Sequence, residues 1–441
     1  MKKLIVIFII LLLLSSIFVS CAQENEYPYF QPLSSLYIPD GVRVVAFGEA
    51  THGSRDLKEL ANEVFKRLVI ENDFRAFAIE APLSNIMAIN EYILYGVGTA
   101  QRAVAQNGYW VHDFQEVVDL VEWMRDFNLT AEVGDELRFY GYDIQEINVS
   151  REKYLAFMRN VDMEKATRDE AAFGSIDTFD TLTIENELLF GYIHHVYKAI
   201  NEMKQNEEIY VQASSQLEFD FALRNLLGVK WTMEMATILT DTDMSQAGII
   251  PDDFDWDGID WDDIDDESIE LFNFRDKRMY ENIKWIVEQE EKRGHGRVFV
   301  FGHNMHIAKD LYSDFIPIGE HLAVYFGDEY FAIGTEVYQS TFIAFQVGWR
   351  LVEGSITNDT SELINKFIDS YIDIGVVNIR RHIEANGRMG EILSNAQLMS
   401  SVGSVFHHDA PLRAYQHPVI PAASYDAIIF VRYDRPARFV E

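Results

Sequence analysis

Basic residues are scarce in this sequence of 441 residues. It has 37 Lys and Arg against 71 Asp and Glu, which gives a formal net charge of −34. Binding a nucleic-acid backbone requires clustered Lys and Arg that replace counterions, so this composition argues against nucleic acid as a partner. The chain has only 25 Gly and 10 Pro, and 48% of it is hydrophobic, which excludes collagen-like and disordered classes.

Cysteine and the common nucleophile motifs are also lacking. The only cysteine is Cys21, so no internal disulfide and no cysteine-rich metal centre can form. The sequence has no G-x-S-x-G elbow, no P-loop and no H-E-x-x-H motif, and Gly96-Val97-Gly98 lacks the third glycine of a dinucleotide site. Any catalysis must therefore rest on His, Glu, Asp, Arg or Tyr.

The first 21 residues resemble the signal of a bacterial lipoprotein. Lys2 and Lys3 precede the apolar run Leu4–Leu14, and Val19-Ser20-Cys21 matches a processing site at which the cysteine is lipidated. No later run approaches the ~20 apolar residues of a membrane span. We expect residues 1–21 to be a lipoprotein signal peptide and Cys21 to anchor the protein on the extracytoplasmic side of a membrane. An ordinary secreted protein or an uncleaved anchor helix are the alternatives.

The remaining chain predicts an α/β fold with a mainly parallel sheet, flanking helices and a large helical subdomain. An apolar strand, a helix and a second strand follow one another from residue 42 to 79, which is the order of a βαβ unit. We expect 331–336 and 341–345 to form a strand pair. The predicted divisions are a linker at 22–40, a first part of the core at 41–149, a helical subdomain at 150–295 and a second part of the core at 296–441.

An acidic segment interrupts the predicted helical subdomain. Residues 252–267 hold ten Asp and Glu, and Asp253, Asp255 and Asp257 match the start of a calcium loop. The twelfth loop position is Ile264 instead of the bidentate Glu that calcium requires. We therefore predict a solvated acidic loop, with calcium binding and a carbohydrate-facing aromatic lid as alternatives.

Ionisable residues follow four of the predicted strands. Because the carboxyl ends of parallel strands meet at one edge of a sheet, we expect these side chains to share a cleft. Histidine together with a carboxylate can activate a water molecule as a general base. His112, by contrast, is interpreted as a capping or surface group near the start of a helix. The strand-end residues are Glu49, His52, Arg55, Glu80, Asp143, His303 and His306.

Several segments around these residues resemble the erythromycin esterase family. They occur in the family's order between about residues 40 and 345, and so cover most of the chain that follows the predicted signal. The Glu-x-x-His motif at Glu49, with Glu80 thirty-one residues after it, is the most specific feature. The matching segments are Phe47–Arg55, Phe74–Glu80, Trp110 with Glu116–Arg125, Tyr140–Asp143 and Phe301–His306.

The resemblance implies an α/β core with helical additions and hydrolysis of a macrocyclic ester. We expect a small-molecule ester or lactone as the substrate and no cofactor, with a divalent metal as the alternative. His52 matches the proposed general base, and Glu49 and Glu80 match carboxylates that orient it. His303 and His306 match a histidine pair lining the same cleft, and Arg55 and Asp143 are secondary, substrate-binding matches.

Two other readings of the same residues stay open at the level of sequence. Imidazoles and carboxylates suit zinc or manganese, so a metal-dependent hydrolase or metal-binding protein is one alternative. The other is a non-catalytic surface lipoprotein that binds a ligand in an inherited cleft.

Overall fold

The computed structural model describes residues 28–178, 181, 184–241, 266–311, 313–346 and 350–440. The predicted signal peptide with Cys21, the start of the linker at 22–40 and nearly all of the acidic segment 252–267 lie outside the described residues. Within the described ranges, no helix combines the length and the apolar character needed to cross a bilayer.

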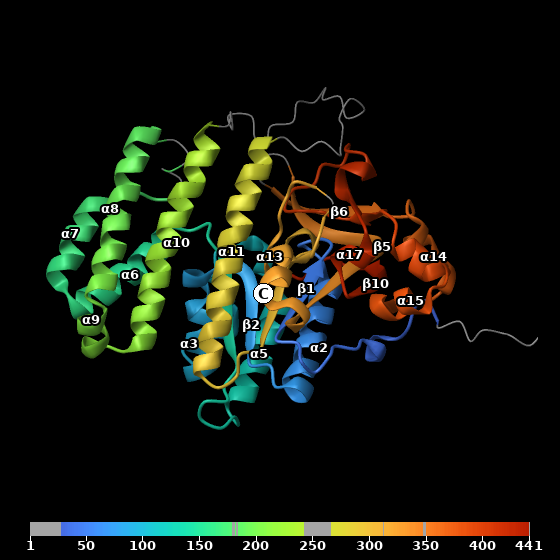
Figure 1. Cartoon of the computed structure of the whole chain (residues 1–441), viewed down its shortest axis with the longest axis horizontal. Helices are drawn as coiled ribbons and strands as arrows, with labels where there is room; N and C mark the ends of the chain where they lie inside the picture. The colour runs from blue at the N-terminus through green and yellow to red at the C-terminus, as the bar shows by residue number, and fades with distance from the viewer. Residues whose placement is uncertain are drawn as a thin grey trace, which may run out of the picture.

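A mostly parallel sheet forms the centre of the molecule, which confirms the predicted fold class (Figure 1). Its strand order is β3-β2-β4-β1-β5-β10-β7, and β6 pairs with β5. Only the β7–β10 and β5–β6 pairings are antiparallel. The inner strands β1, β2 and β4 are buried along their whole length and, apart from Glu49, Glu80 and His303, apolar, as expected when helices cover both faces. The strands are β1 (Val44–Glu49), β2 (Ala76–Pro82), β3 (Arg138–Asp143), β4 (Val298–His303), β5 (Tyr330–Gln346), β6 (Arg350–Thr357), β7 (Ile374–Asn378) and β10 (Ala427–Asp434).

Helices from different parts of the chain cover the two faces. One hydrophobic core joins the sheet to α2 (Arg55–Asn72), α3 (Met87–Tyr95), α4 (Ala100–Ala105) and α5 (Gln115–Asn128). A second core lies between the other face and α11 (Asp266–Lys292), α13 (Ile318–Phe326) and α14 (Glu362–Ser370). The short α-helices α12 (Asn304–Ile307), α15 (Ile379–Ala385), α16 (Arg388–Leu393) and α17 (Pro421–Ser424), the paired strands β8 (Gln397–Ser400) and β9 (Gln416–Val419), and several 3-10 turns complete the described elements outside the helical part.

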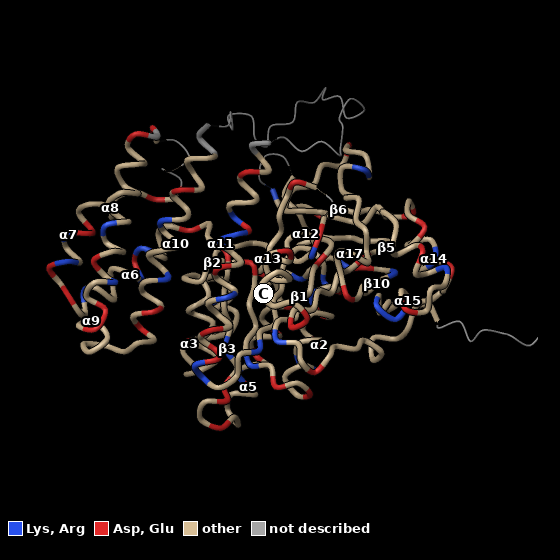
Figure 2. The backbone as a smooth tube through the Cα atoms, viewed as in Figure 1, with Lys and Arg blue, Asp and Glu red and all other residues tan. Residues whose placement is uncertain are grey.

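All the regular elements described between β3 and β4 are helices. The helices α6 to α10 pack around a core of their own, and α11 stands between them and the sheet (Figure 1). Acidic and basic residues are interspersed along these helices instead of being separated by sign (Figure 2). The bounds are α6 (Asn148–Val161), α7 (Met163–Phe173), α8 (Asn186–Gln205), α9 (Glu207–Ala213) and α10 (Gln216–Asp241).

The predicted strand pair at 331–336 and 341–345 is wrong, because both segments belong to the single strand β5. Its first part pairs with β1 and β10, and its last part pairs with β6. The polar residues Gln339 and Ser340, which suggest a turn in the sequence, lie where the strand passes from one set of partners to the other. Ser340 is buried there, and the hydrogen bond that its hydroxyl donates to Asp434 offsets the cost of burying it.

Candidate active site

The carboxyl ends of β1, β2, β3 and β4 bring the predicted polar residues to one edge of the sheet. Glu49 on β1 and His303 on β4 are direct register partners. Glu80 lies near the end of β2, and Asp143 is the last residue of β3. The side chains of His52 and His303 face each other with ring centroids 5.1 Å apart.

A chain of three polar side chains fixes His52. Its Nδ1 lies 2.9 Å from Glu49 Oε1, and Lys58 Nζ lies 2.7 Å from Glu49 Oε2. Lys58 also donates a hydrogen bond to the carbonyl of His52. Glu49 is fully buried, so its charge needs these partners. Because an ionised carboxylate only accepts hydrogen bonds, Nδ1 of His52 carries the proton and Nε2 is the nitrogen left for chemistry.

The loop that presents His52 is held from the far side by β5 and β10. Ser54 caps helix α2 and donates a 2.5 Å hydrogen bond to Asp434 Oδ1 at the end of β10. Gly53 packs so closely on β5 that an added Cβ would lie 1.9 Å from the carbonyl oxygen of Ile343. No side chain fits at that position, so the glycine is required for the loop to approach the strand.

Glu80 contacts three other residues of the cluster. Its Oε1 lies 2.8 Å from Arg275 Nη2 and 3.4 Å from His306 Nε2, and its Oε2 accepts the backbone N–H of His303 at 3.1 Å. Burial acts to raise the pKa of Glu80, but the charges of His306 and Arg275 outweigh it and hold the pKa well below its ordinary value. Glu80 therefore acts as a fixed anion that organises its neighbours.

His303 is held in its neutral form. Burial, together with the nearby His52 and His306, keeps the pKa of His303 well below its ordinary value. Its Nδ1 accepts the N–H of Met305 at 3.4 Å, which leaves the proton of the neutral ring on Nε2. That Nε2 is buried and has no hydrogen-bond partner among the described residues. The ring therefore offers an unused N–H donor.

The pKa of His306 is shifted in the opposite direction, although His306 is only three residues from His303. Its Nδ1 lies 2.9 Å from Asp276 on α11. Burial acts to lower the pKa of His306, but Asp276 and Glu80 outweigh it and raise the pKa. One short motif thus holds a neutral and a more basic imidazole.

The two residues predicted to bind substrate have other partners in the structure. Asp143 is buried, and its two oxygens lie 3.1 Å from Nε and 2.8 Å from Nη2 of Arg275. Arg55 Nε lies 2.8 Å from Glu59 and 3.9 Å from Glu116. The structure therefore joins Asp143 to the cluster, whereas the ion pairs of Arg55 lie outside it.

Four residues of the site are absent from the sequence-based prediction. His112 is not a capping or surface group: it is buried, its Nε2 lies 2.8 Å from the backbone oxygen of Glu80, and burial lowers its pKa to about 4. The other three, Lys58, Arg275 and Asp276, lie on helices. The sequence could have indicated Lys58 and Asp276, because each is a charged residue at a position where the helical repeat of its segment predicts a buried apolar one.

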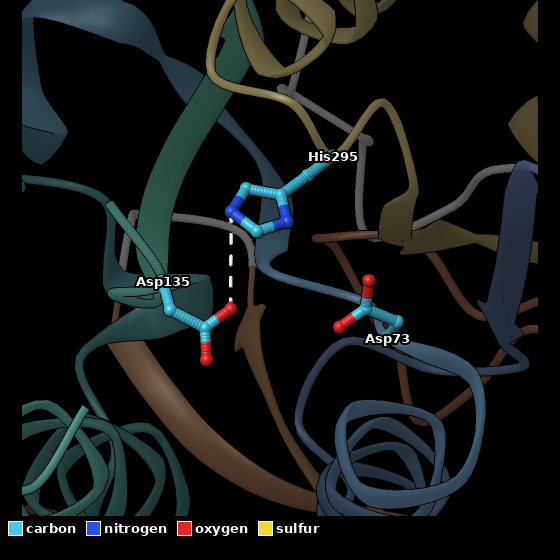
Figure 3. A group of neighbouring side chains, drawn as sticks. All are labelled: Asp73, Asp135 and His295. Atoms are coloured by element: carbon cyan, nitrogen blue, oxygen red, sulfur yellow. Dashed lines mark ion pairs between the residues drawn. The ribbon is translucent and has the colours of Figure 1, made fainter. Parts of the chain in front are cut away.

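A possible metal-binding group lies elsewhere. Within the described part of the chain, Asp73, Asp135 and His295 are the one set of potential ligands close enough to share an ion (Figure 3). They precede β2, β3 and β4 and so lie at the opposite edge of the sheet. Arg75 already binds both carboxylates, at 2.8 Å each. Its guanidinium supplies the positive charge that a metal would bring.

The carboxylates at the candidate active site are likewise engaged. Glu49 binds Lys58 and His52, Asp143 binds Arg275, and Asp276 binds His306. A divalent ion would have to displace these buried partners.

Comparison with known proteins places this chain in a family. The family model for erythromycin esterase matches residues 69–433. Erythromycin esterase type II of Escherichia coli is 25% identical over 324 residues, which cover 71% of this chain and 73% of that protein. A putative hydrolase, YbfO, of Bacillus subtilis is 24% identical over 322 residues, which cover 68% of this chain and 65% of that protein.

Solved structures share the fold. A Bacillus cereus protein superposes with a TM-score of 0.73 at 20% identity, over 91% of both chains. A succinoglycan biosynthesis protein gives 0.71 at 17% identity, over 91% of this chain and 90% of that one. A mutant of the erythromycin esterase EreC in its open conformation gives 0.63 at 15% identity, over 91% and 93%.

The chain therefore belongs to the erythromycin esterase family, a family of hydrolases. The matched range includes Glu80, Arg275 and His303 but begins after Glu49 and His52. The register pair Glu49–His303 and the neighbouring rings of His52 and His303 join the matched part of the site to the part that precedes it.

Asp434, which holds the His52 loop through its hydrogen bond with Ser54, predicts that the stability of the protein depends on pH. Burial raises the pKa of Asp434 to about 7, despite hydrogen bonds from Ser340 and Ser54. The folded protein therefore keeps a proton that the unfolded chain releases above about pH 4. We expect Asp434 to lower the free energy of unfolding as the pH rises from about 4 to about 7, by about 4 kcal/mol at most.

Denaturant unfolding at several pH values compares the wild type with Asp434→Asn. The difference between the two unfolding free energies should change across this window and be constant above it. Glu164→Gln, at an exposed position on α7, is the matched control and should leave the pH dependence unchanged. A wild-type profile parallel to that of Asp434→Asn would contradict the assignment.

Proposed function

We propose that the protein hydrolyses an ester or lactone with a water molecule activated by His52. One observation carries this proposal: the chain Lys58–Glu49–His52 orients an imidazole by its Nδ1, next to the ring of His303, whose Nε2 has no hydrogen-bond partner among the described residues. A base and a hydrogen-bond donor on facing rings are the two groups that acyl transfer to water requires.

The reaction follows from these two groups. His52 Nε2 takes a proton from water as the water oxygen attacks the carbonyl carbon. His303 Nε2–H donates to the carbonyl oxygen, where negative charge develops, and Glu49 stabilises the imidazolium that forms on His52. When the tetrahedral intermediate collapses, the C–O bond to the alcohol breaks and His52 returns its proton to the leaving oxygen. The products are a carboxylic acid and an alcohol, or a single hydroxy acid from a lactone.

The first prediction from this proposal concerns His52. His52→Ala removes the base without removing the Glu49–Lys58 ion pair, so the fold should persist. We expect turnover to fall by roughly 10²–10⁴-fold, the usual contribution of general-base catalysis. The measurement is hydrolysis of a panel of esters and lactones by the purified protein, with the fold checked by circular dichroism.

His194→Ala is the matched control, because His194 is an exposed histidine on α8. It should retain wild-type turnover. A fully active, folded His52→Ala protein would assign the base elsewhere. Binding of panel compounds with no turnover by the wild type would favour the non-catalytic lipoprotein instead.

The second prediction separates a histidine base from a metal-activated water. A metal would lower the pKa of a bound water towards ~7, and His52 would then be a ligand. Because the carboxylates of the site already bind cations or histidines, we expect full activity after exhaustive treatment with EDTA. Elemental analysis of the purified protein should show well below one transition metal per chain. Activity that disappears on chelation and returns with zinc or manganese would refute the base mechanism.

The third prediction concerns location. We propose that Cys21 is lipidated after removal of residues 1–20, which would anchor the hydrolase to the extracytoplasmic side of a bacterial membrane. The experiment is expression in a bacterial host, membrane fractionation and mass spectrometry of the amino-terminal peptide. Wild-type protein should be in the membrane fraction with a diacylated cysteine, and Cys21→Ala should lack the lipid. An unmodified Cys21 in the purified wild type would overturn the proposal.

A further inference from the structure

Helix α11 reaches the candidate active site from the helical part of the molecule. It stands between α10 and the sheet in Figure 1, and residues 279–287 pack against one face of that sheet. Near its first turns, two consecutive residues, Arg275 and Asp276, extend toward the strand ends. Both are polar residues that the reaction does not use directly.

Arg275 connects three separate elements. Its guanidinium lies 2.8 Å from Glu80 on β2, 2.8 Å from Asp143 on β3 and 3.2 Å from His306 Nε2 on α12. Burial acts to lower the pKa of Arg275, but Asp143 and Glu80 outweigh it and keep the pKa well above its ordinary value. Only a planar fork with several donors can make all these contacts at once.

Asp276 makes the second connection. It is fully buried, its Oδ2 lies 2.9 Å from His306 Nδ1, and the same oxygen accepts the N–H of Ile318 at 3.0 Å. Ile318 is the first residue of α13. Asp276 therefore fixes the ring of His306 and the start of the next helix together.

These contacts reach His303 through Glu80. The oxygen of Glu80 that does not bind Arg275 accepts the N–H of His303 at 3.1 Å. The same oxygen would lie 3.1 Å from a Cβ added at Gly302. The Glu80 carboxylate is therefore in direct contact with the backbone of His303, the residue whose ring carries the unused N–H donor.

We propose that Arg275 and Asp276 are positioning residues through which helix α11 sets the orientation of Glu80 and the placement of His303. The proposal rests on the function assigned to His303 above. It makes the helical part of the chain, and not only the sheet, a determinant of the active geometry.

A spectroscopic experiment tests the proposal without a substrate. The charged and titratable groups facing His306 are Asp276 and Arg275 on α11, Glu80 on β2 and His303 on β4. In the full chain labelled with ¹³C-histidine, His306 should titrate above its ordinary pKa of ~6.5. Asp276→Asn should lower that pKa, because the anion that favours the imidazolium is gone. The His306 signal is assigned from its loss in His306→Gln.

A kinetic experiment tests the placement of His303. Arg275→Lys keeps the charge but loses the fork, so we expect kcat to fall by about 10²-fold, as for a misplacement of about 1 Å, with KM nearly unchanged. Arg278→Lys is the matched control. It changes the same residue type one turn later, where the arginine pairs with Glu281 of its own helix at 2.7 Å. Its kcat should match the wild type.

The outcomes separate the inference from the proposed function. If no ester or lactone is hydrolysed, the function fails, and the His306 titrations alone decide the inference. If His306 in the wild type titrates at or below its ordinary pKa, or Asp276→Asn leaves it unchanged, the connection to α11 is overturned. Equal kcat values for Arg275→Lys and Arg278→Lys overturn it as well. Should Asp276→Asn fail to fold, the wild-type titration and the arginine pair give the answer.

Discussion

Burial of carboxylates at the carboxyl edge of the sheet is the constraint on which the rest of the site depends. Glu49 and Asp276 are fully buried, and Glu80 and Asp143 are nearly so. Removing an unpaired carboxylate from water costs several kcal/mol or more, so each one demands a cation or several N–H donors close by. Lys58 and Arg275 meet this demand from α2 and α11. The helices around the edge are thus positioned by charge as well as by apolar packing.

The strands and most of the site could be predicted because their signals are local. Glu49 and His52 directly follow an apolar strand, and His303 ends another, so hydrophobic pattern and parallel topology place them at the same edge. Arg275 is 195 residues from Glu80 along the chain. Its partner depends on how α11 packs, and a single sequence contains no information on that contact. The same limit applies to β5, whose change of pairing partners depends on strands far away in sequence.

The histidines show a second limit of reasoning from residue type. His303 and His306 belong to one motif, yet their pKa values are shifted in opposite directions. Burial acts against the charge of both rings. Asp276 raises the pKa of His306, whereas the neighbouring His52 and His306 lower that of His303. Their chemical roles therefore follow from the neighbours that the fold supplies, and pairs of groups driven apart in this way are typical of acid–base sites.

The charge balance of the site also fits the reaction proposed for it. Proton transfer from water to His52 creates an imidazolium beside Glu49 and negative charge on the carbonyl oxygen near His303, so the net charge of the site is unchanged during attack. No counterion has to enter or leave. What the site must supply is fixed dipoles and charges that are already oriented, since reorientation at the moment of reaction would add to the barrier. Glu49, paired with Lys58, contacts the ring of His52, whereas Glu80, paired with Arg275, accepts the backbone N–H of His303. Each ion pair thus links one residue of the proposed mechanism to a different helix.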